Sequence, residues 1–427
     1  MSLHIRVLGC LPVSGRLRSD PLNLTWVIPP QGELSFMTAI PHPPTGKTAI
    51  VGGGVIGLAI GWRLAEAGRR AEIFERGIAG HGASWAAAGM LAAGSEVEPG
   101  EGALFGLLKH SQSLWPGFAA ELAEASGIDV ELRTEGTISI ALSQDDLGRL
   151  RQTYALQQQL GVASRWLSRA EALEHEPYLN PRLAGALLVH GDHQVENRIL
   201  VAALKTAFAR AGGLLHEDAG DVTVRTVRNR AVGVAAGGIE YPADTVIVAA
   251  GAWTPDVPGL PTADSPPVRP VKGQMLALKM DPAAPILTHV LWTPKAYLVP
   301  RRDGRLLIGA TTEERGFDTS LTAGGMLSLL ESAWRALPGI EELAIVESWV
   351  GFRPGSRDDA PILGTTGTKG LILATGHHRN GILLTPATAD AIARLVLTGE
   401  TDPTIAGFGL ARFAQEDLTR KKTWISA

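Results

Sequence analysis

A glycine-rich turn between an apolar strand and a helix constrains this chain more than any other feature of its sequence. Residues Thr48–Val51 ("TAIV") have the character of a short buried strand, and the run "GGGVIG" follows them directly. The run contains the motif G-x-G-x-x-G, formed by Gly52, Gly54 and Gly57. Glycines at these positions let the backbone approach a pyrophosphate closely and let the following helix pack against the sheet.

The segment after the motif completes a nucleotide-binding unit. Apolar side chains recur at helical spacing over Val55–Ala65, and Gly68 is a typical residue after a helix end. A second predicted strand, Ala71–Phe74, leads into Glu75, about 20 residues beyond the motif. The helix N-terminus then offers N–H groups to a pyrophosphate, and Glu75 accepts hydrogen bonds from ribose hydroxyls. The alternative is a glycine-rich turn that binds nothing.

Later segments indicate FAD rather than NAD. Two further apolar strands, Thr245–Ala250 and Leu371–Thr375, break at Gly251 and Gly376. Together with the first strand they predict one sheet whose carboxyl ends line a cofactor crevice. The run Gly80–Leu91 ("GHGASWAAAGML") is small and nearly uncharged, so a large planar ligand can lie against its backbone. This is more surface than a nicotinamide needs, and FAD is the expected cofactor.

Composition excludes several classes of protein. The chain has 427 residues, enough for two domains, and a net charge of −4, which gives no basic face for nucleic acid. No apolar run reaches the roughly 18 residues of a membrane span. Cys10 is the single cysteine, so no internal disulfide framework is expected. We expect a cytoplasmic protein with no nucleic-acid or membrane partner.

Residues 1–45 differ from the rest of the chain. They are rich in Pro, Gly and Ser, show no sustained helical period, and lack the apolar core of a signal peptide. We interpret them as a disordered N-terminal extension, with Met37 a plausible true start.

The polar string "GHHRNGILLTPAT" (residues 376–388) lies between a buried strand and a predicted helix. Thr385 followed by Pro386 predicts an N-cap with proline at the first helical position. The positive end of that helix would point into the crevice, where it favours the negative charge of a reduced flavin.

The charged residues of the same string have no obvious structural task. Arg379 can complete the electrostatics of the substrate or of the flavin, and the alternative is a surface arginine in a loop. His377 and His378 remain without an assigned role in proton transfer.

Arg353 is the best candidate for binding a substrate carboxylate. It lies between an apolar strand and a proline, in "GFRPGSRDD", and a guanidinium grips a carboxylate with two parallel hydrogen bonds. The alternative is a structural ion pair with Asp358 or Asp359. Arg357 is the weaker candidate, because it lies in a solvated run of charges.

Tyr297 begins a predicted strand that turns through Asp303–Gly304. Alternation places Tyr297 and Val299 on one face, so the Tyr297 hydroxyl could donate to the substrate carboxylate. The alternative is a half-buried strand tyrosine without a role in binding.

The string "HGDHQVENRIL" resembles a metal site in composition only. His190, Asp192, His193 and Glu196 do not have a spacing that builds a site, and the string is more typical of a turn that caps a helix starting at Asn197. No metal is expected.

From about Thr48 to its C-terminus the chain resembles the D-amino-acid oxidase superfamily of flavoproteins, and within it the glycine oxidase (ThiO) type linked to thiamine biosynthesis. The resemblance rests on "VGGGVIGLAIGWRLAEAG", "FERG", "GASWAAAGMLAAGSEVE", "HSQSLWPGFAAELAEASGID", "VKGQMLAL", "AYLVPRRDGRLLIGATTEE", "WVGFRPGSRDDAPILG" and "GHHRNGILLTPATADAIARLVLTGE", in this order. The first piece is generic to flavoproteins, and the last three are much more specific.

The resemblance implies a role for each matching residue. The substrate contacts are Arg353, Arg379 and Tyr297. The FAD contacts are Gly52, Gly54, Val55, Ile56, Gly57, Glu75, Arg76, Ala83, Ser84, Ala88, Gly89, Met90, Val222 (or its neighbour Asp221), Gly251, His377, His378, Arg379, Asn380, Gly381, Ile382 and Leu383.

Two departures indicate that FAD is held without a covalent bond. Related demethylases attach flavin through a histidine in a "TWHAAG"-like segment, and Ala86 occupies that place here. Monomeric sarcosine oxidases use a cysteine, and none follows Cys10. His81 lies nearby but is not expected to be an attachment point.

The expected fold class is α/β, with a Rossmann-like FAD-binding domain and an α+β substrate domain on a largely antiparallel sheet. We expect the FAD-binding domain at residues 46–130, 190–255 and 350–427, and the substrate domain at 131–189 and 256–349. The active site should lie where they meet. A homotetramer is expected from the resemblance.

The expected activity is FAD-dependent oxidative deamination of glycine or another small amine or D-amino acid. Hydride passes from Cα to flavin N5, water hydrolyses the resulting imine to the oxo acid and ammonia, and oxygen is reduced to hydrogen peroxide. The alternatives are a D-amino-acid dehydrogenase that passes electrons to a quinone, a sarcosine-type oxidase, the flavoprotein half of an RNA-modifying enzyme, and a non-enzymatic FAD-binding protein.

Overall fold

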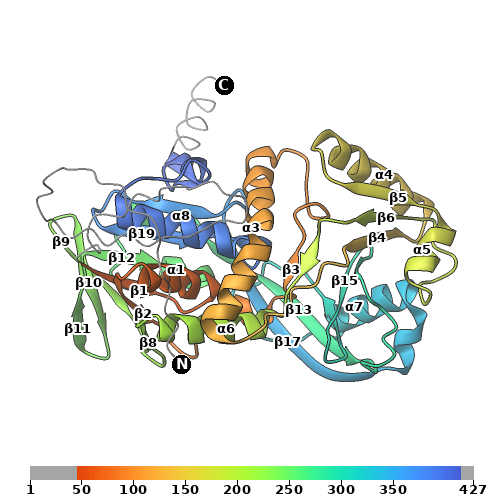
Figure 1. The fold of residues 1–427 in the computed structure, drawn as a ribbon, viewed down its shortest axis with the longest axis horizontal. Coiled ribbons are helices and arrows are strands. Elements are labelled where there is room, and N and C mark those ends of the chain that lie inside the picture. Colours follow the sequence, from red (N-terminus) through yellow and green to blue (C-terminus); the bar gives the residue numbers. More distant parts are fainter. Residues whose placement is uncertain (1–45, 415–427) are drawn as a thin grey trace, which may run out of the picture. The chain divides into compact units, whose positions relative to one another are not determined.

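The structure is a computed structural model that describes residues 46–414, which lie within one compact unit. The predicted extension at residues 1–45 lies outside the described residues and stays a prediction. The described part contains two large sheets and covering helices (Figure 1), which confirms the predicted α/β class.

A six-stranded sheet carries the glycine-rich turn at the carboxyl end of β1, one of its interior strands. Its order is β18-β19-β12-β1-β2-β8, with β18 antiparallel to β19 and the other pairs parallel. The bounds are β1 Lys47–Val51, β2 Arg70–Phe74, β8 Leu214–His216, β12 Thr245–Val248, β18 Ile362–Thr365 and β19 Leu371–Thr375. The strands predicted to end in glycine therefore lie side by side, as β19, β12 and β1, and their carboxyl ends share one edge.

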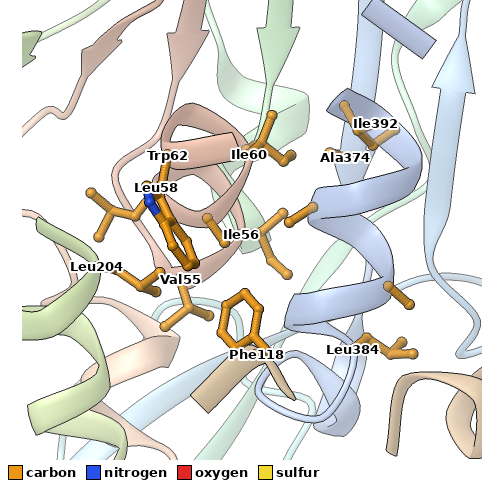
Figure 2. Packing of buried hydrophobic residues seen from close by; sticks show 14 of the residues in the cluster. Val55, Ile56, Leu58, Ile60, Trp62, Phe118, Leu204, Ala374, Leu384 and Ile392 are labelled. Carbon is orange, nitrogen blue, oxygen red and sulfur yellow. The ribbon is translucent and has the colours of Figure 1, made fainter. Parts of the chain in front are cut away.

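Helices cover one face of this sheet. They are α1 Val55–Glu66, α3 Gly102–Ser126, α6 Asn197–Arg210 and α8 Thr385–Thr398. Figure 2 shows the side chains of α1 lying between Phe118 of α3, Leu204 of α6 and Ile392 of α8. Burial on nearly every side of α1 explains why its sequence is almost entirely apolar.

A small antiparallel sheet packs on the opposite face. It consists of β9 Thr223–Val227, β10 Arg230–Ala236 and β11 Ile239–Pro242. Alternate residues of β1 divide between the two faces, because Ile50 joins the helices whereas Ala49 and Val51 join this sheet.

An eight-stranded sheet forms the second layer of the fold. Its order is β17-β13-β16-β15-β14-β4-β6-β5, and all its pairs are antiparallel except β14 with β4. The bounds are β4 Thr137–Ala141, β5 Ser164–Leu167, β6 Gly185–Val189, β13 Arg269–Lys279, β14 Val290–Trp292, β15 Tyr297–Pro300, β16 Arg305–Gly309 and β17 Ala344–Gly355. The largely antiparallel second sheet is thus confirmed.

The faces of the eight-stranded sheet have different neighbours. α5 (Arg169–His175), α7 (Ala323–Ala336) and the 3-10 helix η3 (Pro338–Glu342) pack on one face. The opposite face packs against the short helix α2 (Ala83–Ala86) and Ala88, which follow the nucleotide-binding unit. The remaining elements are β3 Met90–Leu91, α4 Gln144–Gln159, β7 His193–Gln194, η1 Gly251–Asp256, η2 Thr262–Asp264, η4 His378–Asn380 and η5 Ala406–Phe408.

The strands can be compared with the predicted domain segments. Every strand of the six-stranded sheet falls within residues 46–130, 190–255 or 350–427. In the eight-stranded sheet, β17 crosses the predicted boundary, because its pairing with β13 continues to Gly355. The boundaries between two domains stay a prediction.

The start of α8 differs from the prediction. Leu384 is the N-cap residue, Thr385 is the first helical residue, and no side chain caps this end. The reason is that the 3-10 turn η4 and the turn after it already bring Leu384 into a helical conformation, with φ −81° and ψ 0°. The Thr385 hydroxyl therefore donates to the carbonyl of Gly381 at 2.8 Å instead of capping the helix.

The predicted cap of α6 is confirmed. The Glu196 carboxylate accepts hydrogen bonds from the N–H groups of Arg198 (2.7 Å) and Ile199 (3.5 Å). The Asp192 carboxylate likewise accepts hydrogen bonds from backbone N–H groups, those of Gly94 and Ser95. Within residues 46–414, no cluster of His, Cys, Asp and Glu side chains has the geometry of a metal site.

Replacing Gly57 by alanine should destabilise the fold, because an added Cβ would collide with the carbonyl oxygen of Gly52. We expect a loss of about 1–3 kcal/mol in the free energy of unfolding, measured by urea denaturation. The matched control is Gly106→Ala, at an exposed site of α3 where a Cβ meets no atom within 4 Å. That variant should be neutral or slightly stabilised. Equal stability of both variants would show that the close approach at Gly57 is unimportant.

Candidate active site

One cavity of about 1020 Å³ brings residues from both large sheets together. It begins at the carboxyl ends of β1, β2, β12 and β19 and extends to β13, β15 and β17. The sequence-predicted residues that line it are Gly52, Gly54, Val55, Ile56, Glu75, Arg76, Ala83, Ser84, Ala88, Gly89, Met90, Asp221, Val222, Gly251, Tyr297, Arg353, His377, His378, Arg379, Gly381 and Ile382. Gly57, Asn380 and Leu383 are buried and do not line it.

The glycine-rich turn forms one end of the cavity. The N–H of Gly53 donates to the Glu75 carboxylate at 2.7 Å, and the N–H of Val55 donates to the Ser84 hydroxyl at 3.0 Å. The first turn of α1 carries no acidic residue. Its N–H groups and helix dipole therefore create an environment that favours an anion beside the carboxylate that ends β2.

Residues 83–90, most of which are small, form one wall of the cavity. A Cβ on Gly351 of β17 would lie 2.5 Å from the Ala86 Cβ, so this strand approaches α2 very closely. Trp349 Nε1 donates to the Ala86 carbonyl at 3.0 Å, and the N–H of Val195 donates to the Gly89 carbonyl at 2.9 Å. At Gly89 and Gly351 an added Cβ would collide with Val195 and Ala86, so these positions have no room for larger side chains.

Arg301 supports this wall and was missed from the sequence. Its side chain is buried, and Nη2 donates to the Ala88 carbonyl (2.7 Å) and to Asn197 Oδ1 (3.0 Å). Nη1 donates to the Val195 carbonyl at 2.7 Å. Burial lowers the pKa of Arg301 to about 10, so the guanidinium stays charged at neutral pH. Strand alternation after Tyr297 could have identified it, since Tyr297, Val299 and Arg301 share one parity.

Arg353 lies at the other end of the cavity. Its guanidinium sits over Gly273 of β13, where a Cβ would approach Nη1 to 2.7 Å, and Nη1 donates to the Thr311 carbonyl at 3.1 Å. Asp358 is held by Arg412 at 2.8 Å, and Asp359 lies 3.4 Å from His378. Within residues 46–414 neither carboxylate forms the structural ion pair considered for Arg353, because Asp358 is paired with Arg412 and Asp359 lies beside His378.

Tyr297 lies close to Arg353. Tyr297 and Val299 pack in the same cluster, with Met275, which confirms the predicted alternation. The Tyr297 hydroxyl contacts Met275 Sδ at 3.7 Å. Burial raises the pKa of Tyr297, and the charge of Arg353 opposes this shift. The hydroxyl therefore stays protonated and able to donate a hydrogen bond at neutral pH.

His377 and His378 line the cavity in their neutral forms. Burial lowers the pKa of each to about 3, and the charge of Arg379 adds to the effect at His378. His377 Nε2 lies 3.1 Å from the hydroxyl of Thr388 in α8.

Arg379 is surrounded by carboxylates. Its Nε lies 2.9 Å from Glu96 Oε2, and Nη2 lies 3.0 Å from Glu98 Oε1 and 3.6 Å from Glu101 Oε1. Nη2 also donates to the Glu96 carbonyl at 3.0 Å. These acids come from the segment "SEVEPGE" (residues 95–101), which sequence reasoning did not connect with Arg379.

The fold and the cavity define a class of protein. A βαβ unit with G-x-G-x-x-G, opening onto a cavity shared with an antiparallel sheet, is the architecture of a dinucleotide-dependent oxidoreductase. Residues 47–395 match the family model described as FAD dependent oxidoreductase. The chain belongs to this family.

Relatives of known type cover almost the whole chain. Glycine oxidase of Geobacillus kaustophilus is 41% identical over 85% of this chain and 96% of its own length. The crystal structure of glycine oxidase from the same organism matches with a TM-score of 0.79, covering 86% of this chain and 99% of that one. The bifunctional protein ThiO/ThiG of Trichormus variabilis is 34% identical over 88% of this chain and 56% of its own length.

The residues of the cavity fit the FAD that this family uses. The N–H groups of α1 and Glu75 suit a pyrophosphate and a ribose, and the wall of residues 83–90 suits a flat ring system. Ala86 is buried under Gly351 and offers no atom for a covalent bond to flavin. Across residues 46–414, no helix has the length and apolarity needed to cross a membrane.

Replacing Arg301 by methionine should weaken FAD binding by about tenfold or more, because the carbonyls of Ala88 and Val195 would lose a charged donor. The measurement is the FAD dissociation constant of the apoprotein, followed by quenching of flavin fluorescence. Arg302→Met is the matched control, since the neighbouring Arg302 side chain is half exposed and pairs with Asp129. If both variants bind FAD as tightly as the wild type, Arg301 does not support the wall formed by residues 83–90.

Proposed function

We propose that this chain oxidises glycine or another small amine or D-amino acid, with FAD as its non-covalent cofactor. The amine loses two electrons and two hydrogens and becomes an imine, which water hydrolyses to the oxo acid and ammonia, while oxygen is reduced to hydrogen peroxide. This proposal rests mainly on the position of Arg353, whose guanidinium lies beside the protonated Tyr297 in the cavity that fits FAD. The match to glycine oxidase over most of the chain supports it.

We assign the reaction to thiamine (thiazole) biosynthesis. The support is the similarity to bifunctional ThiO/ThiG proteins, with which the chain aligns over 88% of its length in one case. By family resemblance we further propose a cytoplasmic homotetramer, with an FAD-binding domain built on the six-stranded sheet and a substrate domain on the eight-stranded sheet.

The substrate end of the cavity is suited to hold an amino acid in one orientation. Arg353 would bind the carboxylate with two parallel N–H donors, and the Tyr297 hydroxyl would donate a further hydrogen bond. Fixing the carboxylate at two points would also fix the orientation of the Cα and the amine within the cavity. FAD, when bound, supplies the acceptor for the hydride that leaves Cα.

The rest of the cavity would position the cofactor. We propose that the N–H groups of Gly54–Gly57 and the carboxylate of Glu75 hold the pyrophosphate and the ribose, and that residues 83–90 and 377–383 hold the flavin. The N-terminus of α8 adds a partial positive charge near Gly381 and Ile382, which line the cavity. This charge stabilises negative charge that develops at that end of the site.

Peroxide release tests the proposed function. The purified yellow protein is incubated in air with glycine, sarcosine, D-alanine, D-proline or L-alanine, and peroxide is measured for each. We expect peroxide with glycine among the best substrates. Anaerobic bleaching of the flavin without peroxide in air would indicate a dehydrogenase instead. No bleaching with any of these amines would overturn the assignment of a small-amine substrate.

Replacing Arg353 by alanine should raise KM for glycine by roughly 30-fold or more, because removing the charged partner of a bound carboxylate costs about 2 kcal/mol or more. The KM of Arg353→Lys should lie between those of the wild type and Arg353→Ala, since lysine keeps the charge and loses the paired donors. FAD should stay bound in both variants, as judged by the flavin absorbance after gel filtration. The control is Arg357→Ala, because Arg357 lies over the Phe413 ring and does not line the cavity. An unchanged KM in Arg353→Ala would exclude Arg353 as the anchor.

A further inference from the structure

The contacts of Arg379 set it apart from Arg353, although both guanidiniums belong to residues that line the same cavity. Arg379 is ion-paired with Glu96, Glu98 and Glu101, and it also donates to a backbone carbonyl. Arg353 donates to the carbonyl of Thr311, and within residues 46–414 no carboxylate forms an ion pair with it. The two arginines therefore differ in what they can offer a substrate anion.

Glu96 is the most deeply placed partner of Arg379. Its side chain is 8% exposed, compared with 61% for Glu98 and 19% for Glu101. Glu96 and Glu98 line the cavity, whereas Glu101 does not. The backbone before it is fixed, because buried Asp192 accepts hydrogen bonds from the N–H groups of Gly94 (2.9 Å) and Ser95 (2.7 Å). Glu96 is therefore held in place beside Arg379.

Several charged groups from neighbouring elements surround Glu96. Arg379 and Arg353 lower the pKa of Glu96, and Asp192 raises it. Glu98 and Glu101 pair with Arg379 and raise its pKa. Asp359 lies beside His378, which is neutral. Lys295 lines the cavity as well, but its side chain is exposed and its charge is screened by water. With its acids ionised, the surroundings of Arg379 carry net negative charge.

We propose that Glu96 is a specificity-determining residue, which neutralises Arg379 and so restricts the site to amines that carry a single carboxylate. The first carboxylate of a substrate is bound by Arg353. A second carboxylate, as in an aminodicarboxylic acid, would meet Arg379 already paired and the acids around it, and like charges brought together in a buried site repel. This inference rests on the proposed function, because it assumes that the ligand is an amino acid anchored at Arg353.

The protonation of Glu96 should make the preference for a single carboxylate depend on pH. Burial raises the pKa of Glu96 to about 7, against the opposing effect of Arg379. Glu96 is therefore ionised above about pH 7 and protonated below it. In its neutral form it no longer cancels the charge of Arg379, so the site should accept a second carboxylate more readily as the pH falls.

The test compares the binding of acids that cannot be oxidised as amines. Acetate and succinate are titrated into the FAD-loaded protein, and their dissociation constants are obtained from changes in the flavin absorbance. In Glu96→Gln, which keeps the shape and removes the charge, succinate should bind at least roughly tenfold more tightly relative to acetate than in the wild type. Glu98→Gln is the matched control, because Glu98 pairs with the same arginine from an exposed position, and its effect should be much smaller.

The pH dependence of the wild type gives a measurement without any substitution. The preference for acetate over succinate should be stronger at about pH 8.5 than at about pH 6.5, on either side of the Glu96 pKa of about 7, and it should not change in Glu96→Gln. An unchanged preference in Glu96→Gln, or an equal effect of Glu98→Gln, would overturn the inference. So would a failure of the wild type to bind either acid.

The two proposals can fail separately. If acids bind as expected but no amine is oxidised, the proposed function is wrong, whereas the role of Glu96 in selecting anions stands. If amines are oxidised and Glu96→Gln leaves the preference between the acids unchanged, the inference about Glu96 falls alone.

Discussion

The packing of residues 83–90 between the two large sheets is the constraint on which the cavity depends. Ala86 approaches Gly351 of β17 so closely that Gly351 has no room for a Cβ, and Trp349 and Arg301 donate hydrogen bonds to the carbonyls of Ala86 and Ala88. The small residues bring the eight-stranded sheet close to the carboxyl ends of β1 and β12. Since the glycine-rich turn, this wall and Arg353 all line one cavity, that cavity can hold a dinucleotide and a small substrate together.

Charge compensation decides how the buried polar groups of this cavity are used. Arg301 donates to carbonyl and amide oxygens, Arg379 is ion-paired with carboxylates, and Arg353 donates to the carbonyl of Thr311. A buried guanidinium with a carboxylate partner is already neutralised, whereas one without such a partner attracts an anion. Three arginines that look alike in the sequence therefore have different electrostatic tasks in the folded protein.

The sequence predicted the parts of the fold that depend on neighbouring residues. The strand, glycine turn and helix at Thr48–Ala65 and the strand Leu371–Thr375 appear as expected, because each follows from local periodicity and from the conformations open to glycine. The cap of α8 was wrong by one residue, since a 3-10 turn that local propensity does not reveal brings Leu384 into the helix. The candidate residues were mostly brought to one cavity, because the matching motifs lie at strand ends and in the loops that follow them.

The sequence by itself thus determined the nucleotide-binding unit, the strands that end in glycine and the residue types that suit FAD and a carboxylate. Only the tertiary structure decided which charges meet. Arg379 and Glu96 are 283 positions apart, and Arg301 reaches the Ala88 carbonyl across 213 positions. No local pattern records such pairs, because burial and partner choice arise when distant segments pack together. For that reason the sequence alone could place Arg379 at the site but could not show that Arg379 is already paired with carboxylates.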